Sequence, residues 1–405
     1  MARPLPLAAP IAAPIAAPIA APIAALVAAF GLLTASPVCS EPLQAIPVDL
    51  RVPCPPGAVE AEGQRHLVYE LHLTNLGGVE LVLERLDVLD AAAGAVLTAY
   101  DGDALAPIMS RPGARDLPDP RVIGPGLSAV LFIDVIQPST AAAPAALTHR
   151  LTFRPTTPAS AASAQSLVSG GRVAVDRRAP VVLGPPLRGG GWLASHALAN
   201  DSSHRRTLIA LNGQARIAQR FAIDWTRIGP DGQVFRDDPA DNANWTPWGA
   251  EVLAVADGVV VELVDGIPEN DPTADAKAVP ITVDNAAGDH LVLDIGHGRY
   301  VMYGHLRPGS FRVGLGARVR RGQVVAALGN SGKSDAPHLH LQVTDGPEPL
   351  ASEGVPYVFE RFRLEGHLSS LKALVDGTGW RPTEPATVRD REMPVKNAVV
   401  AFPDR

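Results

Sequence analysis

Residues 336–343 read Ala336-Pro337-His338-Leu339-His340-Leu341-Gln342-Val343, which places two imidazoles two positions apart inside an apolar run. On a β-strand, residues i and i+2 point to the same face, so His338 and His340 are expected to share one side of a sheet. Two buried histidines side by side are costly unless their nitrogens have partners, and histidine is the commonest metal ligand. A role in packing or hydrogen bonding is the alternative that the pair alone leaves open.

The composition favours β-rich domains. The chain has 405 residues, enough for two or three domains, with 37 glycines, 39 prolines and only 5% aromatic residues. Frequent turn residues and few long periodic helices are typical of short strands joined by turns. The net charge of −7 and the lack of a basic stripe argue against nucleic acid as a partner.

Residues 1–40 predict a secretory signal peptide. A low-complexity Ala-Ala-Pro-Ile repeat over residues 8–25 leads into an apolar run at 26–33, with Arg3 in front and small residues at 34–40 for cleavage. A membrane anchor is the alternative, but a proline at every fourth position would interrupt a spanning helix. We therefore expect an exported protein of the periplasm or cell envelope.

The rest of the chain predicts a mainly β protein with two folded parts. Short alternating runs between residues 45 and 155 indicate an immunoglobulin-like β-sandwich, since they recur at regular spacing between turn-rich segments. The clearest expected strands are residues 67–74, 79–89, 127–136 and 147–153. Residues 156–178 are expected to form a linker, because their first half is rich in Ala, Ser, Thr and Pro. A second β-rich domain is expected over residues 179–364, followed by a tail over 365–405.

The second domain contains several further motifs. Residues 249–261 are two apolar runs around an Asp-Gly turn, which is a hairpin signal. Residues 291–295 and 300–305 form another such pair, and the second run ends in Tyr303-Gly304-His305. Residues 319–332 then lead to the strand that carries His338 and His340.

In the order and spacing of these motifs, residues 185–345 resemble the M23 family, the lysostaphin-like or LytM-type zinc metallopeptidases. The resemblance implies an antiparallel β core with a groove, and a zinc metalloendopeptidase that cleaves peptide bonds in peptidoglycan or related peptides. It implies Asp224 and His340 as zinc ligands, and His305 and His338 as the histidines that orient or deprotonate the attacking water. Three protein ligands and one open position are typical of catalytic zinc, which activates water and polarises a carbonyl group.

One expected ligand is missing from the sequence. The family's His-x-x-x-Asp motif would place a histidine four residues before Asp224, where this chain has Arg220. A guanidinium has no lone pair for zinc, and it would repel the cation if it projected into the site. Either the chain is a degenerate, non-catalytic LytM-like cell-envelope factor that binds a partner protein or cell-wall peptide, or another residue supplies the third ligand.

His204 is the candidate for that third ligand. Residues 205–210 and 215–223 predict the two arms of a hairpin. With a three-residue loop, His204 lies opposite Ala222, on the face of Asp224 and within reach of a shared ion. With a two-residue loop, His204 lies opposite Phe221, on the other face. The hypothesis therefore depends on the hairpin register.

Overall fold

The computed structural model describes residues 47–114, 117–156, 166–370, 374, 380–382 and 385–404, so the expected signal peptide lies outside it. Residues 45–405 form a single unit. The described part is mainly β, as predicted, and includes the short 3₁₀ helices η1 (Gly102–Ala104), η2 (Ala106–Ile108) and η3 (Asn242–Asn244). Within that part, no helix has the length and apolar character needed to cross a membrane.

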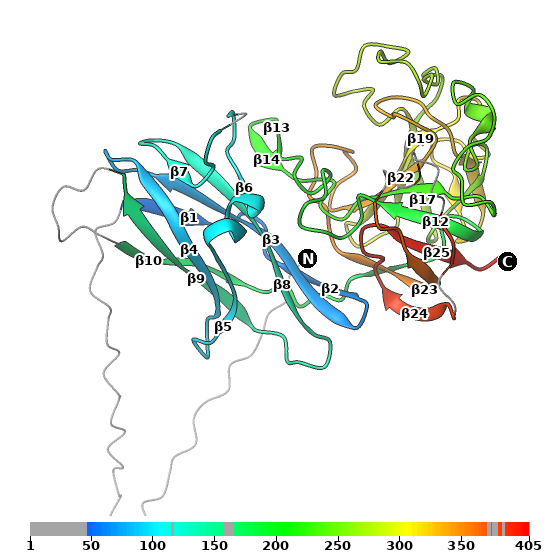
Figure 1. Ribbon diagram of the computed structural model, residues 1–405. Coiled ribbons are helices and arrows are strands. Elements are labelled where there is room, and N and C mark those ends of the chain that lie inside the picture. Colours follow the sequence, from blue (N-terminus) through cyan, green and yellow to red (C-terminus); the bar gives the residue numbers. More distant parts are fainter. Residues whose placement is uncertain are drawn as a thin grey trace, which may run out of the picture. The chain divides into compact units, whose positions relative to one another are not determined.

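The N-terminal part is a sandwich of two antiparallel sheets, β1–β10 (Figure 1). The first sheet is centred on β3 (Gln64–Asn75) and β8 (Ser128–Pro138), and the second on β4 (Leu81–Asp90) and β9 (Ala146–Pro155). The flanking strands are β1 (Val48–Arg51), β2 (Gly57–Ala61) and β6 (Met109–Ser110) in the first sheet, and β5 (Val96–Asp101), β7 (Val122–Ile123) and β10 (Ser166–Ala174) in the second. Buried residues of both sheets share one core. The apolar positions of the alternating sequence pattern therefore face the space between two packed sheets. Its immunoglobulin-like type stays a prediction.

The linker prediction is wrong for residues 166–174, which form β10 and pair with β9. Val168 on this strand is buried in the core of the sandwich. Polar, turn-rich composition does not exclude an edge strand, because an edge strand needs apolar side chains on one face only. Residues 157–165 of the expected linker lie outside the described residues.

The C-terminal part is built on one long sheet, here called the large sheet, which has eleven strands within the described residues. Its central strands, in order and antiparallel, are β12 (Gly189–Ser195), β15 (Ile223–Arg227), β22 (Leu339–Thr344) and β19 (Tyr300–Leu306). The outer strands are β11 (Val181–Leu183), β17 (Gly258–Val264), β18 (Asp289–Asp294), β20 (Arg318–Val319), β23 (Tyr357–His367), β24 (Thr387–Glu392) and β25 (Ala398–Phe402). Two separate pairs are β13 (Ile209–Leu211) with β14 (Gln214–Arg216), and β16 (Glu251–Leu253) with β21 (Val324–Ala327).

Two sequence predictions fail in this part. The expected tail is not a tail, because β25 lies between β12 and β23 in the large sheet and its apolar side chains are buried. The expected hairpin over residues 249–261 is also wrong, since β16 pairs with β21 while β17 pairs with β18. A local turn signal identifies the reversal but not the partner strand, which here comes from a distant part of the sequence.

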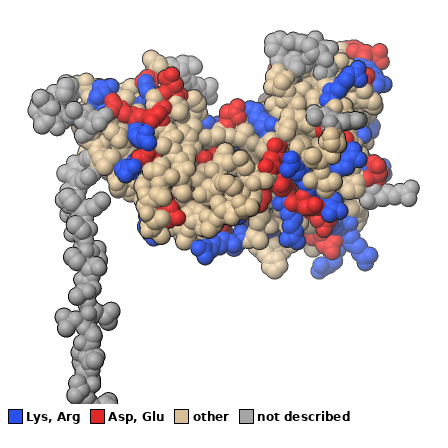
Figure 2. All heavy atoms as spheres, turned by 60° about the horizontal axis from the view of Figure 1, so that its bottom comes forward, with Lys and Arg blue, Asp and Glu red and all other residues tan. Residues whose placement is uncertain are grey.

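Acidic and basic side chains are intermixed on the face shown in Figure 2. Exposed ion pairs occur between neighbouring strands, such as Arg361 and Asp390 of β23 and β24, whose Nε and Oδ1 atoms are 2.5 Å apart. Exposed pairs of this kind contribute about 0–1 kcal/mol. The strand pairing and the buried apolar clusters therefore hold the fold together.

Candidate metal centre

The site is built where the central strands of the large sheet lie side by side. Asp224 on β15 and His340 on β22 are direct cross-strand partners. On its other side His340 faces Gly304 of β19, and His305 follows immediately. A Cβ atom at Gly304 would lie 3.5 Å from the Cβ of His340 and 3.2 Å from a backbone oxygen, so the absent side chain leaves room for the imidazole. Strand register thus delivers three of the predicted site residues to one place.

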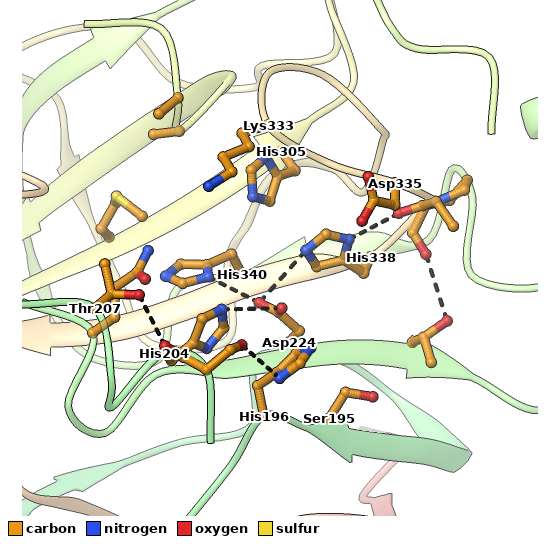
Figure 3. Close-up of a pocket in the computed structure, with 18 of the residues that line it drawn as sticks. Ser195, His196, His204, Thr207, Asp224, His305, Lys333, Asp335, His338 and His340 are labelled. Atoms are coloured by element: carbon orange, nitrogen blue, oxygen red, sulfur yellow. Dashed lines mark hydrogen bonds and ion pairs between the residues drawn. The ribbon is translucent and has the colours of Figure 1, made fainter. Parts of the chain in front are cut away.

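His204 joins Asp224 and His340 in a cluster of three groups that can hold a metal ion (Figure 3). One ligand atom from each residue lies within 4.8 Å of the others. His204 Nε2 is 3.2 Å from Asp224 Oδ2, and His340 Nδ1 is 2.8 Å from Asp224 Oδ1. Two imidazoles and one carboxylate form a donor set that zinc accepts in catalytic sites.

The hydrogen-bond network assigns the tautomer of His340. The Nε2 amide of Gln342 donates to the carbonyl of Pro349 at 2.7 Å, so the Gln342 Oε1 atom faces His340. His340 Nε2 therefore carries a hydrogen and donates it to that oxygen at 3.0 Å. The lone pair of Nδ1 is then directed at the carboxylate of Asp224, and two lone-pair atoms 2.8 Å apart require a positive charge, a proton or a metal ion, between them.

Asp224 is held in its ionised form. Burial alone would raise the pKa of this carboxyl, but the charges of His204 and His338 and their hydrogen bonds outweigh burial and hold the pKa well below its usual range. An anionic carboxylate among imidazoles is the charge distribution that favours a cation.

His305 and His338 form the second half of the site, with ring centroids 4.7 Å apart. The Nδ1–H group of His305 donates to the Ser331 carbonyl at 2.8 Å, and that of His338 donates to the Ala336 carbonyl at 2.8 Å. Burial, followed by the neighbouring histidines, lowers the pKa of His305 well below its usual value. Burial would also lower the pKa of His338, but the negative charge of Asp224 outweighs it and raises that pKa. Adjacent groups with opposed shifts are suited to accept and donate protons.

His204 reaches the cluster by a route different from the predicted one. The hairpin has a two-residue loop, with Asn212 and Gly213 both at positive φ, which was the register expected to turn His204 away. Its arms are only three residues long, however, and His204 lies outside them in a turn. The hairpin register therefore does not determine where His204 lies. His204 is in the cluster, but the predicted reason for its position, a three-residue loop, was wrong.

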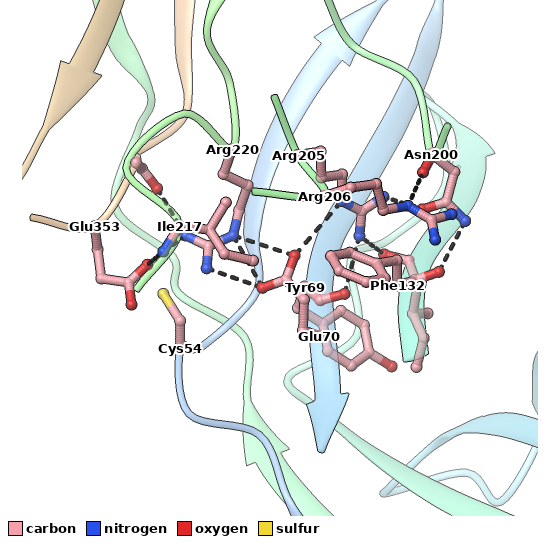
Figure 4. Close-up of polar contacts among 12 residues, drawn as sticks. Cys54, Tyr69, Glu70, Phe132, Asn200, Arg205, Arg206, Ile217, Arg220 and Glu353 are labelled. Carbon is pink, nitrogen blue, oxygen red and sulfur yellow. Dashed lines mark hydrogen bonds and ion pairs between the residues drawn. The ribbon is translucent and has the colours of Figure 1, made fainter. Parts of the chain in front are cut away.

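Arg220 does not project into the site. Its guanidinium turns toward Glu70 of β3, with Nη2 at 2.8 Å from Oε2, and toward Glu353, with Nη1 at 2.8 Å from Oε2 (Figure 4). Nη1 also donates to the Gly354 carbonyl at 3.0 Å. Its ion pairs and hydrogen bonds are with residues other than His204 and His340. The guanidinium therefore does not project toward a cation held by those residues, and the repulsion considered from the sequence does not arise.

His196 and Gln342 also lie at the site, and they were not predicted from the sequence. His196 follows β12 at a positive φ of 53°, unusual for a residue with a side chain, and its ring centroid is 4.9 Å from that of His204. Ser203 Oγ lies 3.0 Å from its Nδ1. Nothing local in the sequence marks His196, since its neighbour His204 is brought close only by tertiary folding. Gln342 could have been predicted, because it lies two residues beyond His340 and residues i and i+2 of a strand share a face.

The cluster opens into a pocket of about 520 Å³. Its lining includes the polar side chains of Ser195, His196, Lys333 and Asp335. The rest includes apolar side chains, among them Val234, Phe235, Trp245 and Met302. A pocket of this size with a few convergent polar groups is typical of a site that binds a small molecule or a short peptide segment.

Part of the chain is similar to known peptidases. Residues 245–352 match Peptidase family M23. The comparison with curated proteins found no match. Among solved structures, the chain is similar to the catalytic domain of a prophage-encoded M23 protein from Enterococcus faecalis, with 19% identity, 44% of this chain and 93% of that chain covered, and a TM-score of 0.25.

Two further similar structures are the catalytic domain of the antimicrobial peptidase lysostaphin from Staphylococcus simulans (19% identity, 39% and 80% covered, TM-score 0.20) and a zinc-containing peptidase from Vibrio cholerae (17% identity, 50% and 79% covered, TM-score 0.19). The family match includes His305, His338 and His340 and begins after His204 and Asp224. The segment that carries these three histidines therefore matches Peptidase family M23.

Proposed function

We propose that this chain is a zinc metalloendopeptidase that hydrolyses peptide bonds in peptidoglycan or related peptides. An M23 segment implies either a peptidase or a degenerate homologue. The observation that favours the peptidase is the complete donor set of His204, Asp224 and His340, because His204 fills the gap left by Arg220. A decayed site would have no reason to keep two imidazoles and an ionised carboxylate converging on one point.

The three residues would hold zinc through His204 Nε2, a carboxylate oxygen of Asp224 and His340 Nδ1. When bound, zinc supplies Lewis acidity, which activates water and polarises a carbonyl oxygen. The hydrogen bond from His340 Nε2 to Gln342 leaves the lone pair of Nδ1 available for the metal. The set fits a catalytic site, in which three protein ligands leave one position open.

His305 and His338 would move the protons of the reaction. The Nδ1–H bond of His305 to the Ser331 carbonyl leaves its Nε2 with a lone pair, so this imidazole can accept a proton from water. His338, whose pKa is raised beside Asp224, is the better proton donor for the amine that leaves. Both rings can also donate hydrogen bonds to the oxygen on which negative charge develops.

The pocket suggests how a peptide would be bound. The lining offers charges of opposite sign in Lys333 and in Asp335, which also pairs with Lys277, and apolar surface in Phe235 and Trp245. A short peptide with both charged and apolar groups, such as the stem and bridge peptides of peptidoglycan, fits this combination. The resemblance to M23 peptidases points to the same substrate class.

The test is digestion of purified peptidoglycan by the zinc-loaded protein, with the released peptides analysed by mass spectrometry. Hydrolysis produces new amino and carboxyl termini, and His305→Ala is the matched inactive control. Release of cleaved peptides by the wild-type chain alone supports the proposal. Binding to peptidoglycan without cleavage would indicate instead the non-catalytic cell-envelope factor, whose partner is a protein or a cell-wall peptide.

Export to the periplasm or cell envelope is the second part of the proposal. It is supported by the low-complexity apolar segment at residues 8–33 and the small residues that follow it. N-terminal sequencing of the mature protein from a cell-envelope fraction tests it. Removal of the first 34–40 residues is expected, and an intact Met1 in mature protein would contradict it.

A further inference from the structure

His204 lies in a segment that is bound to the sandwich. This anchor segment, residues 200–206, contacts strands β3 and β8 (Figure 4). Asn200 Nδ2 donates to the Phe132 carbonyl at 2.8 Å, and Arg205 Nη2 donates to the Tyr69 and Ile133 carbonyls at 2.9 and 2.6 Å. Every one of these acceptors is a backbone carbonyl of a strand in the first sheet of the sandwich.

Arg206 adds a second attachment. Its Nη2 atom donates to the Pro107 carbonyl at 2.7 Å, and its guanidinium carbon lies 4.3 Å from the centre of the Phe132 ring. Arg206 Nε also donates to the Asn200 carbonyl at 2.7 Å, which closes the anchor segment on itself. The residues on both sides of the turn that contains His204 are thereby tied to the sandwich.

Arg205 is the strongest of these anchors. Only 2% of its surface is exposed, so its donors have no water to replace the carbonyls. The carboxylate of Glu70, 3.5 Å from Arg205 Nε, supplies the compensating charge. A buried guanidinium bound in this way has one preferred position. Because Arg205 directly follows His204 in the chain, it also restricts the position of the His204 backbone.

The other contacts of His204 are made by its own imidazole, which faces Asp224 Oδ2 at 3.2 Å and lies against the rings of His196 and His340. Asp224 and His340 are placed by strand pairing, but His204 lies in a turn outside the strands. Its Nδ1 atom is buried and has no hydrogen-bond partner among the described residues. A metal-binding imidazole usually has its second nitrogen oriented by a neighbouring group. For His204, the attachment of its backbone through Arg205 and Arg206 takes the place of that partner.

We propose that the sandwich positions His204 for metal binding, with Arg205 as the positioning residue that connects them. The proposal rests on the proposed function, since it requires the cluster to bind zinc. It gives the N-terminal sheets a defined role. Without the carbonyls of β3 and β8, the segment that carries His204 would keep only its contacts with the C-terminal part, such as the bond from Ser202 Oγ to the His196 carbonyl at 2.6 Å and the Asp201–Lys396 ion pair at 2.8 Å. The metal site would then belong to both parts of the chain, although two of its three ligands lie on the large sheet.

The experiment compares Arg205→Met with Arg220→Met in the full chain. Both variants remove a buried arginine that pairs with Glu70, but only Arg205 adjoins His204. Zinc affinity is measured by competition with a chromophoric chelator, and folding by circular dichroism. Arg205→Met is expected to lower zinc affinity by about 10- to 100-fold, as loss of an orienting partner typically does, while folded Arg220→Met binds zinc like the wild type.

Equal zinc affinity in folded Arg205→Met and Arg220→Met would overturn the proposal. If Arg205→Met does not fold, Arg206→Met is the milder variant, since Arg206 is only half-buried and its loss leaves the Arg205 contacts in place. A smaller loss of zinc affinity is expected there, and no loss counts against the proposal. If the wild-type chain binds no zinc, the proposed function is overturned as well. If the wild type binds zinc and neither Arg205→Met nor Arg206→Met lowers the affinity, only the role of the sandwich is overturned.

Discussion

Replacing Arg220 with methionine is expected to lower the free energy of unfolding and to leave the zinc affinity unchanged. Arg220 and Glu70 are 6% and 3% exposed and are joined by three guanidinium-to-carboxylate contacts between 2.8 and 3.3 Å. Burial alone would raise the pKa of Glu70, but the charges of Arg220 and Arg205 outweigh it and keep the carboxylate ionised. Arg220→Met therefore leaves the buried Glu70 carboxylate with the more distant Arg205, and it also removes the ion-pair partner of Glu353.

Breaking a buried ion pair on one side costs about 3–5 kcal/mol, because the remaining charge is left without compensation. Arg205, at 3.5 Å from Glu70, retains part of that compensation, so the lower end of the range is expected. Denaturant unfolding measures the change. The matched control is Arg361→Met, which removes an exposed pair and should change the free energy of unfolding far less.

The zinc affinity of folded Arg220→Met is expected to equal that of the wild type, because Arg220 contacts none of the candidate ligands. A gain in zinc affinity would show instead that Arg220 repels the cation. A loss of stability no larger than that of Arg361→Met would refute the energetic part, because it would mean that Glu70 does not depend on Arg220.

Three further outcomes follow from the structure. His305→Ala and His338→Ala should each retain zinc and lower turnover by about 10²- to 10⁴-fold, and unchanged turnover in His305→Ala would count against its role. Gln342→Leu should lower zinc affinity by about 10- to 100-fold, because His340 loses the acceptor that orients it, while Thr344→Val, which removes a buried hydrogen bond on the same strand, should not. Burial lowers the pKa of His149 to about 4, so between pH 6.5 and 4 the unfolded chain binds a proton that the folded chain does not. Stability should therefore fall by about 3 kcal/mol across that window as the pH drops, and a His149→Gln variant with the same pH slope would contradict this.

The strands of the fold were largely readable from the sequence. Residues 67–74 fall within β3, and all but the first residue of 127–136 fall within β8, because alternation of polar and apolar side chains is a direct consequence of a half-buried sheet. Pairing was not readable to the same extent. The strand β25 was taken for part of a tail because a short apolar run does not reveal whether a distant edge such as β12 is available to bind it.

The site was predictable where it depends on local spacing. His338 and His340 came from the two-residue period, and Asp224 and His305 from the resemblance to M23 peptidases. The role of Arg220 could not be predicted, because its partner Glu70 is 150 residues away in the sequence and lies in the other part of the chain. For the same reason, the contacts that hold His204 were invisible: they are made to backbone carbonyls, which have no sequence signature.

The metal content of the purified chain decides whether His204, Asp224 and His340 hold zinc. After zinc loading and removal of free metal, elemental analysis should find about one zinc per wild-type chain and far less in His204→Ala and His340→Ala, because three ligands are needed to hold the ion. Absence of zinc from the loaded wild-type chain would contradict the metallopeptidase account. Full retention of zinc by His204→Ala would show that the third ligand has been assigned to the wrong residue.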